Sequence, residues 1–176
     1  MAAIQWVGFF VFSAALLYIS KLSLRERLPH GYYRFFAWEA ALALVLINLD
    51  SWFDNPFSPR QMISWLLLIS SIHMVVQGYR LLRRDGKTAG SFENTTILVK
   101  AGVYQYVRHP MYSSLLLLSL GALLKNPTPL SGALTVAAFL FLTLTAKAEE
   151  QENLEKFGEE YAEYMKSTKR FIPHLF

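Results

Sequence analysis

Residues 111–146 read MYSSLLLLSLGALLKNPTPLSGALTVAAFLFLTLTA, two apolar runs separated by a short turn that contains two prolines. The runs, Met111–Leu124 and Leu130–Ala146, carry no charged residue. Such runs are typical of helices inside a bilayer, where every backbone polar group must find its partner within the helix. Proline disrupts a helix interior but suits its first turn, so the turn ends one helix and begins the next. The stretch therefore predicts a helical hairpin in a membrane.

Three further apolar segments precede this hairpin and extend the pattern over the whole chain. They cover Ile4–Ser20, Phe35–Phe53 and Met62–Leu82. Of the 176 residues, 53% are hydrophobic and 17% are charged, which is too apolar for the surface of a soluble domain of this size. We therefore expect an all-α, polytopic membrane bundle of about five transmembrane helices, forming a single domain over residues 1–176.

Basic residues are distributed unevenly between loops that alternate along the chain. Fifteen of the 17 lie in three stretches, 21–34, 80–108 and 147–170, whereas the alternate loops contain Arg60 and Lys125. Five crossings place the three rich stretches on one face, and an excess of Lys and Arg marks the cytoplasmic face. We expect an integral, multi-pass membrane protein with its N-terminus outside and its C-terminus in the cytoplasm.

The composition changes abruptly after the last apolar segment. Residues Ala148–Lys169 contain seven of the 13 acidic residues. Apolar side chains recur among them at helical spacing, at positions Leu154, Phe157, Tyr161, Tyr164 and Met165. A stripe of this kind beside a charged face predicts a cytoplasmic amphipathic helix that lies against the membrane or the neighbouring loops.

Several functions are disfavoured by composition. The chain has no cysteine, which excludes a disulfide framework, a thiolate zinc site and a cysteine nucleophile, and we expect no metal site. Its net charge of +4 is explained by the cytoplasmic loops, so we expect no nucleic acid partner. Nothing in the sequence calls for a protein partner.

Residues 102–112, GVYQYVRHPMY, contain the strongest candidate for a binding site. Pro110 marks the start of a helix, which places Arg108 and His109 at a helix N-terminus on the cytoplasmic face. Backbone N–H groups, the helix dipole and a guanidinium together favour a carboxylate or phosphate there. Tyrosine rings surround this point and can stack on a flat ring or a cation, at positions Tyr104, Tyr106 and Tyr112. The alternative is an interfacial belt, where Arg and Tyr are common.

The run Glu149-Glu150-Gln151-Glu152 follows the last apolar segment and faces the same compartment. A carboxylate there suits an ammonium group, although acidic residues also simply complement a helix dipole. The combination of an anion site with a cation site fits the amino-acid end of S-adenosylmethionine. The tyrosines are then available for adenine and the sulfonium.

These motifs give the chain a resemblance to a known family. Its residues Gly102-Val103-Tyr104, Val107–Tyr112, Glu149-Glu150 and Phe157–Tyr164 resemble those of the isoprenylcysteine carboxyl methyltransferases, which are membrane enzymes that use S-adenosylmethionine. The resemblance covers about residues 95–176. Phospholipid N-methyltransferases and, more distantly, membrane sterol reductases have similar C-terminal halves, and Arg170–Phe176 is similar to both.

The resemblance implies S-adenosyl-L-methionine as the cofactor and a lipophilic small molecule or lipid as the substrate. It divides the domain into helices one to three over 1–86 and a cofactor-binding half over 87–176, with a cytoplasmic active site. The implied cofactor-binding residues are Thr96, Ile97, Leu98, Val99, Tyr104, His109, Pro110, Met111, Tyr112 and Glu149.

The residues near the acceptor are not identified by the resemblance beyond two candidates, Arg108 and Thr145. Thr145 stands where the eukaryotic enzymes carry an arginine for the substrate carboxylate. A buried anion without a cationic partner is costly, so the sequence favours a neutral or amine-bearing acceptor over a prenylcysteine carboxylate.

We therefore expect a membrane methyltransferase that transfers the methyl group of S-adenosylmethionine to a carboxylate, amine or hydroxyl of a small lipophilic acceptor. Two alternatives remain open at this point. One is a membrane reductase that uses NADPH, and the other is a non-catalytic membrane protein.

Overall fold

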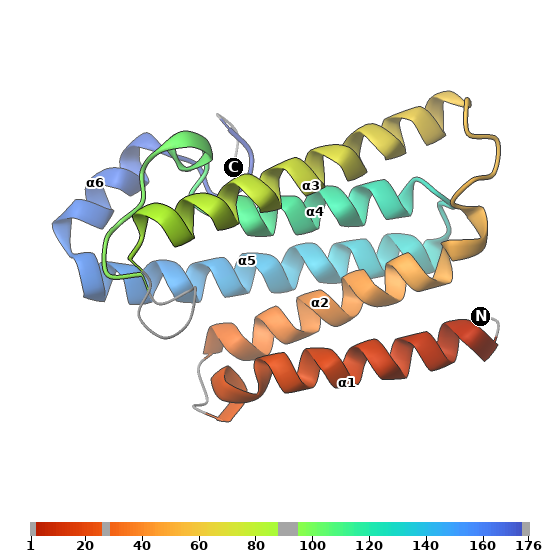
Figure 1. The fold of residues 1–176 in the computed structure, drawn as a ribbon, viewed down its shortest axis with the longest axis horizontal. Helices are drawn as coiled ribbons and strands as arrows, with labels where there is room; N and C mark the ends of the chain where they lie inside the picture. Colours follow the sequence, from red (N-terminus) through yellow and green to blue (C-terminus); the bar gives the residue numbers. More distant parts are fainter. Residues whose placement is uncertain (1–2, 26–28, 88–94, 174–176) are drawn as a thin grey trace.

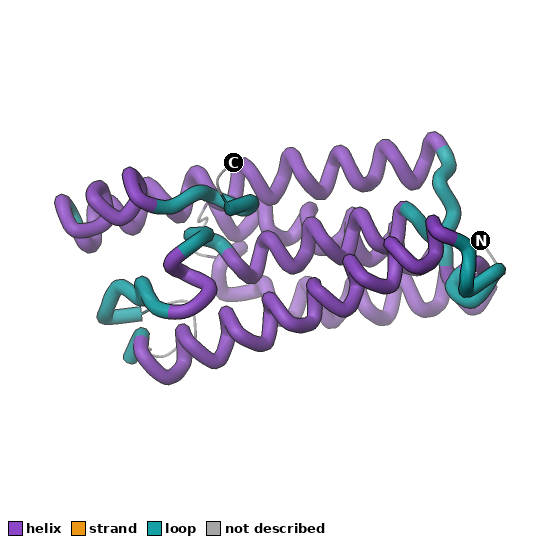
Figure 2. Tube along the Cα trace, turned by 90° about the horizontal axis from the view of Figure 1, so that it is seen from above, coloured by secondary structure: helices purple, strands orange, loops and turns teal. Residues whose placement is uncertain are grey.

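The computed structural model describes residues 3–25, 29–87 and 95–173 as a bundle of helices (Figure 1). Its elements are α1 (Ala3–Arg25), α2 (Pro29–Ile47), the 3₁₀ turn η1 (Leu49–Ser51), α3 (Pro59–Asp85), the 3₁₀ turn η2 (Gly102–Gln105), α4 (Pro110–Leu123), α5 (Pro129–Phe157) and α6 (Glu159–Ser167). Within these ranges there is no strand (Figure 2). The predicted all-α fold is confirmed.

The five longer helices lie side by side and alternate in direction along the chain (Figure 1). The main packing pairs are α1 with α2, α2 with α5, α5 with α4, and α4 with α3. The C-terminal ends of α1, α3 and α5 therefore meet the N-terminal ends of α2 and α4 at one end of the bundle. α6 and η2 lie at that same end, on the left in Figure 1.

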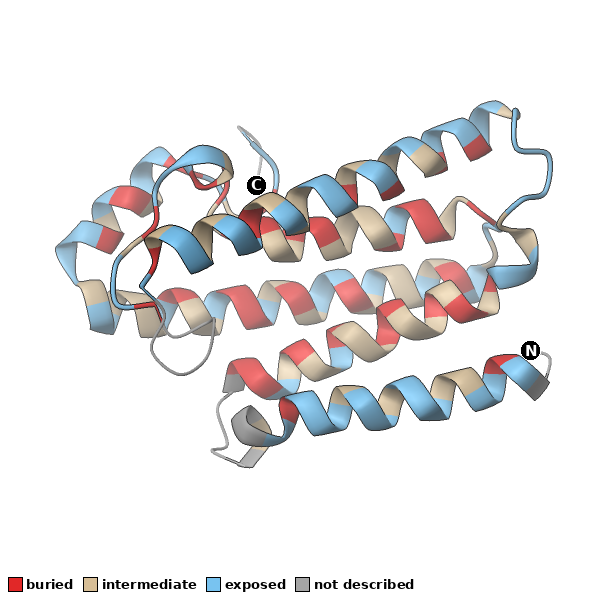
Figure 3. Ribbon diagram, viewed as in Figure 1, coloured by how far each residue is buried: buried red, intermediate tan, exposed pale blue. Residues whose placement is uncertain are grey.

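Three described helices are long and apolar enough to cross a membrane, namely α1 over Ile4–Lys21, α3 and α5. α4 is a shorter apolar helix. Most of the surface of α1 is exposed, and the buried residues of α2, α4 and α5 face the bundle interior (Figure 3). Outward apolar surface of this kind is expected where lipid is the solvent. The chain is an integral membrane protein, and α2 and α4 complete the bundle beside the three clear spans.

The two helix starts that the sequence predicts from proline, at Pro110 and in the turn before Leu130, are confirmed, and α3 also begins at a proline. Pro59, Pro110 and Pro129 are each the first residue of a helix. Two of these helices also have a side-chain cap, because Ser58 and Thr128 each accept a hydrogen bond from the backbone N–H three residues later.

The predicted bounds of two helices are wrong. The second segment was expected over Phe35–Phe53, but α2 starts at Pro29 and ends at Ile47. Asn48 ends it, since its side-chain amide donates to the carbonyls of Leu44 and Ala122 at 3.1 Å each and thereby fixes the turn against α4.

The predicted amphipathic helix over Ala148–Lys169 is divided at Gly158. This residue has φ +57° and ψ −130°, a conformation that glycine adopts far more readily than other residues. α5 therefore continues to Phe157, and the shorter α6 leaves at an angle with Tyr161 and Tyr164 buried.

Lys125 closes the opposite end of the bundle. Its ammonium donates to Gln61 Oε1 at 2.8 Å and to the carbonyl of Trp52 at 3.3 Å. It also lies 3.7 Å from the centre of the Trp65 ring, a cation–π contact. The side chain is fully buried and links the turn after α2 to α3 and to the turn after α4.

Candidate functional site

The C-terminal segment after α6 is hydrogen-bonded to the residues at the start of α4. The backbone N–H of Arg108 donates to the carbonyl of Lys169 at 2.8 Å, and that of His109 donates to Arg170 at 3.1 Å. Ser113 Oγ donates to the carbonyl of Phe171 at 2.8 Å. These bonds hold the segment before α4 alongside the segment after α6, although about 60 residues separate them in sequence. The inner end of the bundle is thereby fixed around the first turn of α4.

Glu150 of α5 lies at the centre of a buried ion-pair cluster. Its carboxylate accepts from Arg108 Nε at 2.9 Å and from Arg170 Nη2 at 2.6 Å, and His109 Nε2 lies 3.5 Å away. The side chains of Arg108 and Glu150 are 8% and 5% exposed, so this pair is closed to solvent. Such a network is a structural clamp that joins α5, α4 and the C-terminal segment.

Arg108 is fully engaged by the protein itself. In addition to Glu150, its guanidinium donates to the carbonyls of Met165 and Thr168. The sequence placed Arg108 at an anion site near the acceptor, whereas its observed partners are groups of this chain. Arg108 therefore positions the C-terminal segment in this structure.

Glu149 is the more open of the two neighbouring carboxylates. Its Oε1 accepts a hydrogen bond from the hydroxyl of Tyr112, and its Oε2 lies 3.5 Å from His109 Nδ1. Its side chain is 21% exposed, against 5% for Glu150. The rings of His109 and Tyr112 are stacked, with centroids 5.5 Å apart and planes 16° apart. Three predicted cofactor residues, His109, Tyr112 and Glu149, are thus in direct contact.

His109 is buried between the two carboxylates. Burial alone lowers the pKa of an imidazole, but the hydrogen-bonding and charge interactions with Glu149 and Glu150 outweigh it, so the pKa of His109 is raised above its ordinary value of 6.5. The cluster therefore favours the protonated ring, a cation beside an open carboxylate.

Three tyrosines close the site on the side of η2 and α6. Tyr104 donates to the carbonyl of Gly78 at 3.4 Å, and its own carbonyl accepts from Tyr164 at 2.6 Å. Burial raises the pKa of Tyr104, and it raises the pKa of Tyr161 to about 12. The hydroxyls of Tyr104 and Tyr164 therefore stay protonated at neutral pH and act as hydrogen-bond donors. Tyr106, by contrast, is 58% exposed.

The other predicted site residues lie around this cluster rather than in it. Pro110 is buried and Met111 is half-buried in the first turn of α4. Segment 96–99 lies against the end of α3, where the backbone N–H groups of Thr96 and Ile97 donate to the carbonyl of Gly86 at 2.9 and 3.3 Å. Ile97 is exposed, Leu98 is half-buried and Val99 is buried.

Thr145 is fully buried inside the bundle. Its hydroxyl donates to the carbonyl of Phe141, one turn earlier on α5, at 2.8 Å. That bond satisfies the hydroxyl within its own helix.

Arg34 of α2 is a residue of this region that sequence reasoning missed. It is 4% exposed and interacts electrostatically with Glu149. Its signal in the sequence is a basic residue just before an apolar run, a pattern that predicts topology and not a binding role.

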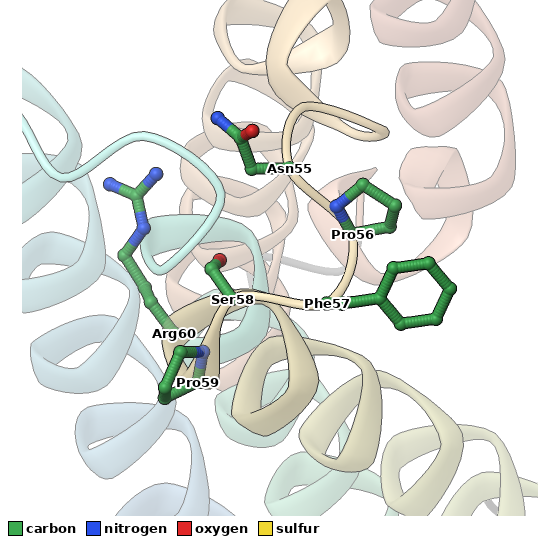
Figure 4. A pocket seen from close by; sticks show the side chains of 6 residues that line it. All are labelled: Asn55, Pro56, Phe57, Ser58, Pro59 and Arg60. Carbon is green, nitrogen blue, oxygen red and sulfur yellow. The ribbon is translucent and has the colours of Figure 1, made fainter.

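A separate surface hollow lies at the opposite end of the bundle, in the loop before α3 (Figure 4). It is lined by Asn55, Pro56, Phe57, Ser58, Pro59 and Arg60. The hollow is shallow and open, and Phe57 within it is 89% exposed. It contains none of the predicted site residues.

A family model described as phospholipid methyltransferase matches residues 59–160. The chain belongs to this family. The matched range runs from the first residue of α3 into α6 and includes the contact between His109, Tyr112 and Glu149.

Individual relatives of the family match a larger part of the chain. The protein-S-isoprenylcysteine O-methyltransferases of Xenopus laevis and Homo sapiens are 32% and 33% identical to it, over 77% of this chain and 52% of each relative. Protein-S-isoprenylcysteine O-methyltransferase B of Arabidopsis thaliana is 28% identical over 94% of this chain and 86% of the relative.

These matches confirm the resemblance to isoprenylcysteine carboxyl methyltransferases. The chain spans about half the length of the vertebrate relatives. No solved structure gives a significant match.

Proposed function

We propose that this protein is an S-adenosylmethionine-dependent methyltransferase that acts on a small lipophilic acceptor taken from the bilayer. The observation that carries the proposal is the open carboxylate of Glu149, held between Tyr112 and His109 in a membrane protein of a methyltransferase family. The carboxylate of the neighbouring Glu150 already accepts hydrogen bonds from Arg108 and Arg170. Glu149 is therefore the carboxylate that we assign to ligand binding.

The residues around Glu149 suit the amino-acid end of the cofactor. Glu149 offers an acceptor for an ammonium group, and the first turn of α4 directs its backbone N–H groups and the positive end of its dipole towards a carboxylate. The raised pKa of His109 favours a positive charge at the same point. Tyr104 of η2 interacts electrostatically with Glu149, and Tyr104 and the exposed Tyr106 are the aromatic rings proposed for the adenine and the sulfonium.

The cofactor supplies an activated methyl group. The task of the protein is to bind the cofactor and the acceptor, to align them with each other and to exclude water. Glu149, His109 and Tyr112 are accordingly assigned to binding and orientation. A carboxylate acceptor needs no general base, and a neutral amine needs none before attack. The relatives are named as isoprenylcysteine O-methyltransferases, which supports an acceptor with a long apolar chain that reaches the site from the bilayer.

The site lies at the bundle end where the basic stretches gather, which supports a cytoplasmic active site and an outside N-terminus by the positive-inside rule. The family match disfavours the reductase that uses NADPH, since the relatives are methyltransferases.

The test measures binding to the purified protein in detergent. We expect S-adenosylhomocysteine to bind and NADPH not to bind in isothermal titration calorimetry. His109→Ala and Glu149→Ala should each lower the affinity for S-adenosylhomocysteine by roughly ten- to 150-fold, the effect of losing a charge-assisted hydrogen bond.

Glu155→Ala is the matched control, because Glu155 lies on the exposed side of the same helical region and contacts Gln151 at 3.5 Å. Its affinity should equal that of the unmodified protein. Unchanged affinity in both site variants, or preferential binding of NADPH, would refute the proposed function.

A further inference from the structure

α3 presents one side to α4 and leaves the opposite side exposed (Figure 3). On the buried side, Ser64 donates to a backbone carbonyl of α4, and Gly78 packs on the first turn of α4. On the opposite side, Leu66, Ile69 and Val76 are exposed. Apolar side chains that are exposed on a membrane-spanning helix face lipid, so this side of α3 contacts the acyl chains of the bilayer.

A stripe of polar residues continues along the same exposed side towards the inner end of the bundle, where the candidate site lies. The polar stripe consists of His73, Gln77, Arg80 and Arg84. Residues at spacings of four, three and four share one face of a helix. His73, Arg80 and Arg84 are exposed and Gln77 is half-buried. Within residues 3–25, 29–87 and 95–173, the side chains of His73, Gln77 and Arg80 form no hydrogen bond or ion pair with the protein.

The length of α3 fixes the depth of the polar stripe in the membrane. The helix has 27 residues and is about 40 Å long, whereas the hydrocarbon core is about 30 Å thick. Its last two turns, which carry Arg80 and Arg84, therefore extend into the headgroup layer. His73 lies seven residues before Arg80, or about 10 Å closer to the middle of the bilayer. A polar side chain at that depth without a partner is costly and is often functional.

The charges at the inner end of α3 favour an anion. Arg84 donates to the neighbouring Asp85 at 2.7 and 3.0 Å, which offsets its charge. Arg83 donates to the neutral hydroxyl of Tyr79 at 3.2 Å and keeps its charge, as does Arg80. Two guanidinium groups in the headgroup layer suit a lipid phosphate, since a guanidinium matches phosphate oxygens with paired N–H donors.

The deeper residues of the polar stripe match the next part of a phospholipid. Below its phosphate, a phospholipid carries the ester carbonyls of its glycerol, which accept hydrogen bonds. The amide of Gln77 and a ring N–H of His73 are donors of the required kind. The order from cations to neutral donors to apolar residues along α3 thus follows the order from phosphate to esters to acyl chains.

A second copy of this chain fits the same surface less well. Two copies have the same orientation in a membrane, so a two-fold axis along the membrane normal brings each residue of this side next to its own counterpart. Arg80 and Arg83 then meet the same cations of the other copy, and such like-charge contacts are unfavourable.

We propose that the exposed side of α3 is a binding site for an anionic phospholipid of the leaflet at the inner end of the bundle. The phosphate binds at Arg80 and Arg83, and the glycerol esters bind at Gln77 and His73. This site lies on the side of α3 that faces away from α4 and the candidate cofactor residues. It is independent of the proposed methyl transfer.

The first test measures lipid binding to the purified, full-length protein in detergent by native mass spectrometry. The two probes are phosphatidylglycerol and phosphatidylcholine with identical acyl chains. The unmodified protein should bind phosphatidylglycerol more tightly by at least about tenfold. Arg80→Gln should lower the affinity for phosphatidylglycerol by about fivefold, whereas Arg80→Lys should retain most of it because the charge remains.

The second test examines the deeper part of the polar stripe with an ether-linked phosphatidylglycerol, which lacks the ester carbonyls. The unmodified protein should bind the ester-linked lipid about two- to tenfold more tightly than the ether-linked one, the effect of a lost hydrogen bond. The double variant His73→Leu, Gln77→Leu should bind the two lipids equally. A difference that persists in this variant would overturn the placement of the esters and the proposal with it.

Arg60→Gln is the matched control, because Arg60 is an exposed cation at the other end of the same helix. It should leave the preference for phosphatidylglycerol intact, and an equal loss in Arg60→Gln and Arg80→Gln would reduce the preference to general attraction and overturn the proposal. Displacement of the lipid by excess inorganic phosphate would overturn it by showing a site for a free anion. A protein without the preference, or a dimer that the His73→Leu, Gln77→Leu variant dissociates, would overturn it equally. No cofactor is present in these measurements, so their outcome is separate from that of the proposed function.

Discussion

Glu149 and Glu150 are neighbours in sequence but have different surroundings. Successive residues on a helix point about 100° apart, so one carboxylate turns towards Tyr112 and His109 and the other towards Arg108 and Arg170. Glu150 is paired with the buried guanidinium of Arg108 and with the partly exposed guanidinium of Arg170, and the Glu149 side chain is the more exposed of the two carboxylates. Glu150 thus serves stability, and Glu149 is the carboxylate assigned to the proposed ligand.

Removal of the Glu150 carboxylate should therefore destabilise the protein more than removal of the Glu149 carboxylate. Glu150→Ala leaves the buried Arg108 and the partly exposed Arg170 without their anion, and breaking a buried pair in this way costs about 3–5 kcal/mol in free energy of unfolding. Reversible unfolding in mixed detergent micelles measures the difference. An equal loss of stability in Glu149→Ala and Glu150→Ala would contradict the division of roles.

The raised pKa of His109 predicts a pH-dependent contribution to stability. A group whose pKa is higher in the folded than in the unfolded state stabilises the fold fully below its unfolded value near 6.5, and this stabilisation is lost as the pH rises through the folded value. The difference in melting temperature between the unmodified protein and His109→Gln should therefore be largest near about pH 6 and shrink towards about pH 9. Gln105→Ala, an exposed change without a titrating group, should show no trend. A difference that grows with pH would show that His109 is held neutral.

At the scale of the elements, Gly158 decides where α5 ends and how α6 leaves it. Its φ of +57° and ψ of −130° are strained for any residue with a Cβ, although a Cβ built there would meet no atom within 4 Å. The position therefore requires glycine for backbone conformation and not for space. α6 contributes Tyr164, whose hydroxyl holds the carbonyl of Tyr104 on η2.

Gly158→Ala should lower the free energy of unfolding by about 1–3 kcal/mol, the cost of a sparsely populated backbone conformation. Gly132→Ala is a clean comparison, because Gly132 lies in the helical part of α5 with open space around its Cβ position. That change should stabilise the protein by about 0.5–1 kcal/mol. Equal effects of the two substitutions on thermal unfolding would show that the α5–α6 junction is not strained.

Helix starts could be predicted from the sequence and some helix ends could not. A proline indicates the start of a helix at its own position in the sequence, as at Pro59, Pro110 and Pro129. The end of α2 depends on a long-range bond from Asn48 to Ala122, and the end of α5 depends on one glycine conformation inside a continuous helical pattern. Neither is visible in the spacing of apolar residues.

At the scale of the whole molecule, the distribution of basic residues predicts one orientation. A cysteine label introduced into the loop 54–60 should react with an impermeant reagent on intact cells, because that loop lies at the bundle end with few cations. A label after residue 176 should react only once the cells are opened. Labelling of the C-terminal position on intact cells would reverse the topology and remove cytosolic access to the site.

The sequence predicts those parts of the candidate site whose residues are close together in the chain. His109 to Tyr112 form the start of one helix. Glu149 of α5 provides the negative charge that contacts this helix start across the bundle. The contribution of Arg34 depends on the pairing of α2 with α5, and the engagement of Arg108 depends on the return of the C-terminal segment. Such long-range pairings carry no signal in one sequence.

The clamp around Glu150 also sets the order in which the protein matures during synthesis. Arg170 and the carbonyls of residues 168–171 follow all five long helices in the chain, so they are synthesised after those helices. Until they emerge, Glu150 and Arg108 lack part of their network and the first turn of α4 lacks its neighbouring strand of backbone. A nascent chain that has already inserted its five long helices therefore still has an incomplete candidate site until residues 168–171 have been synthesised.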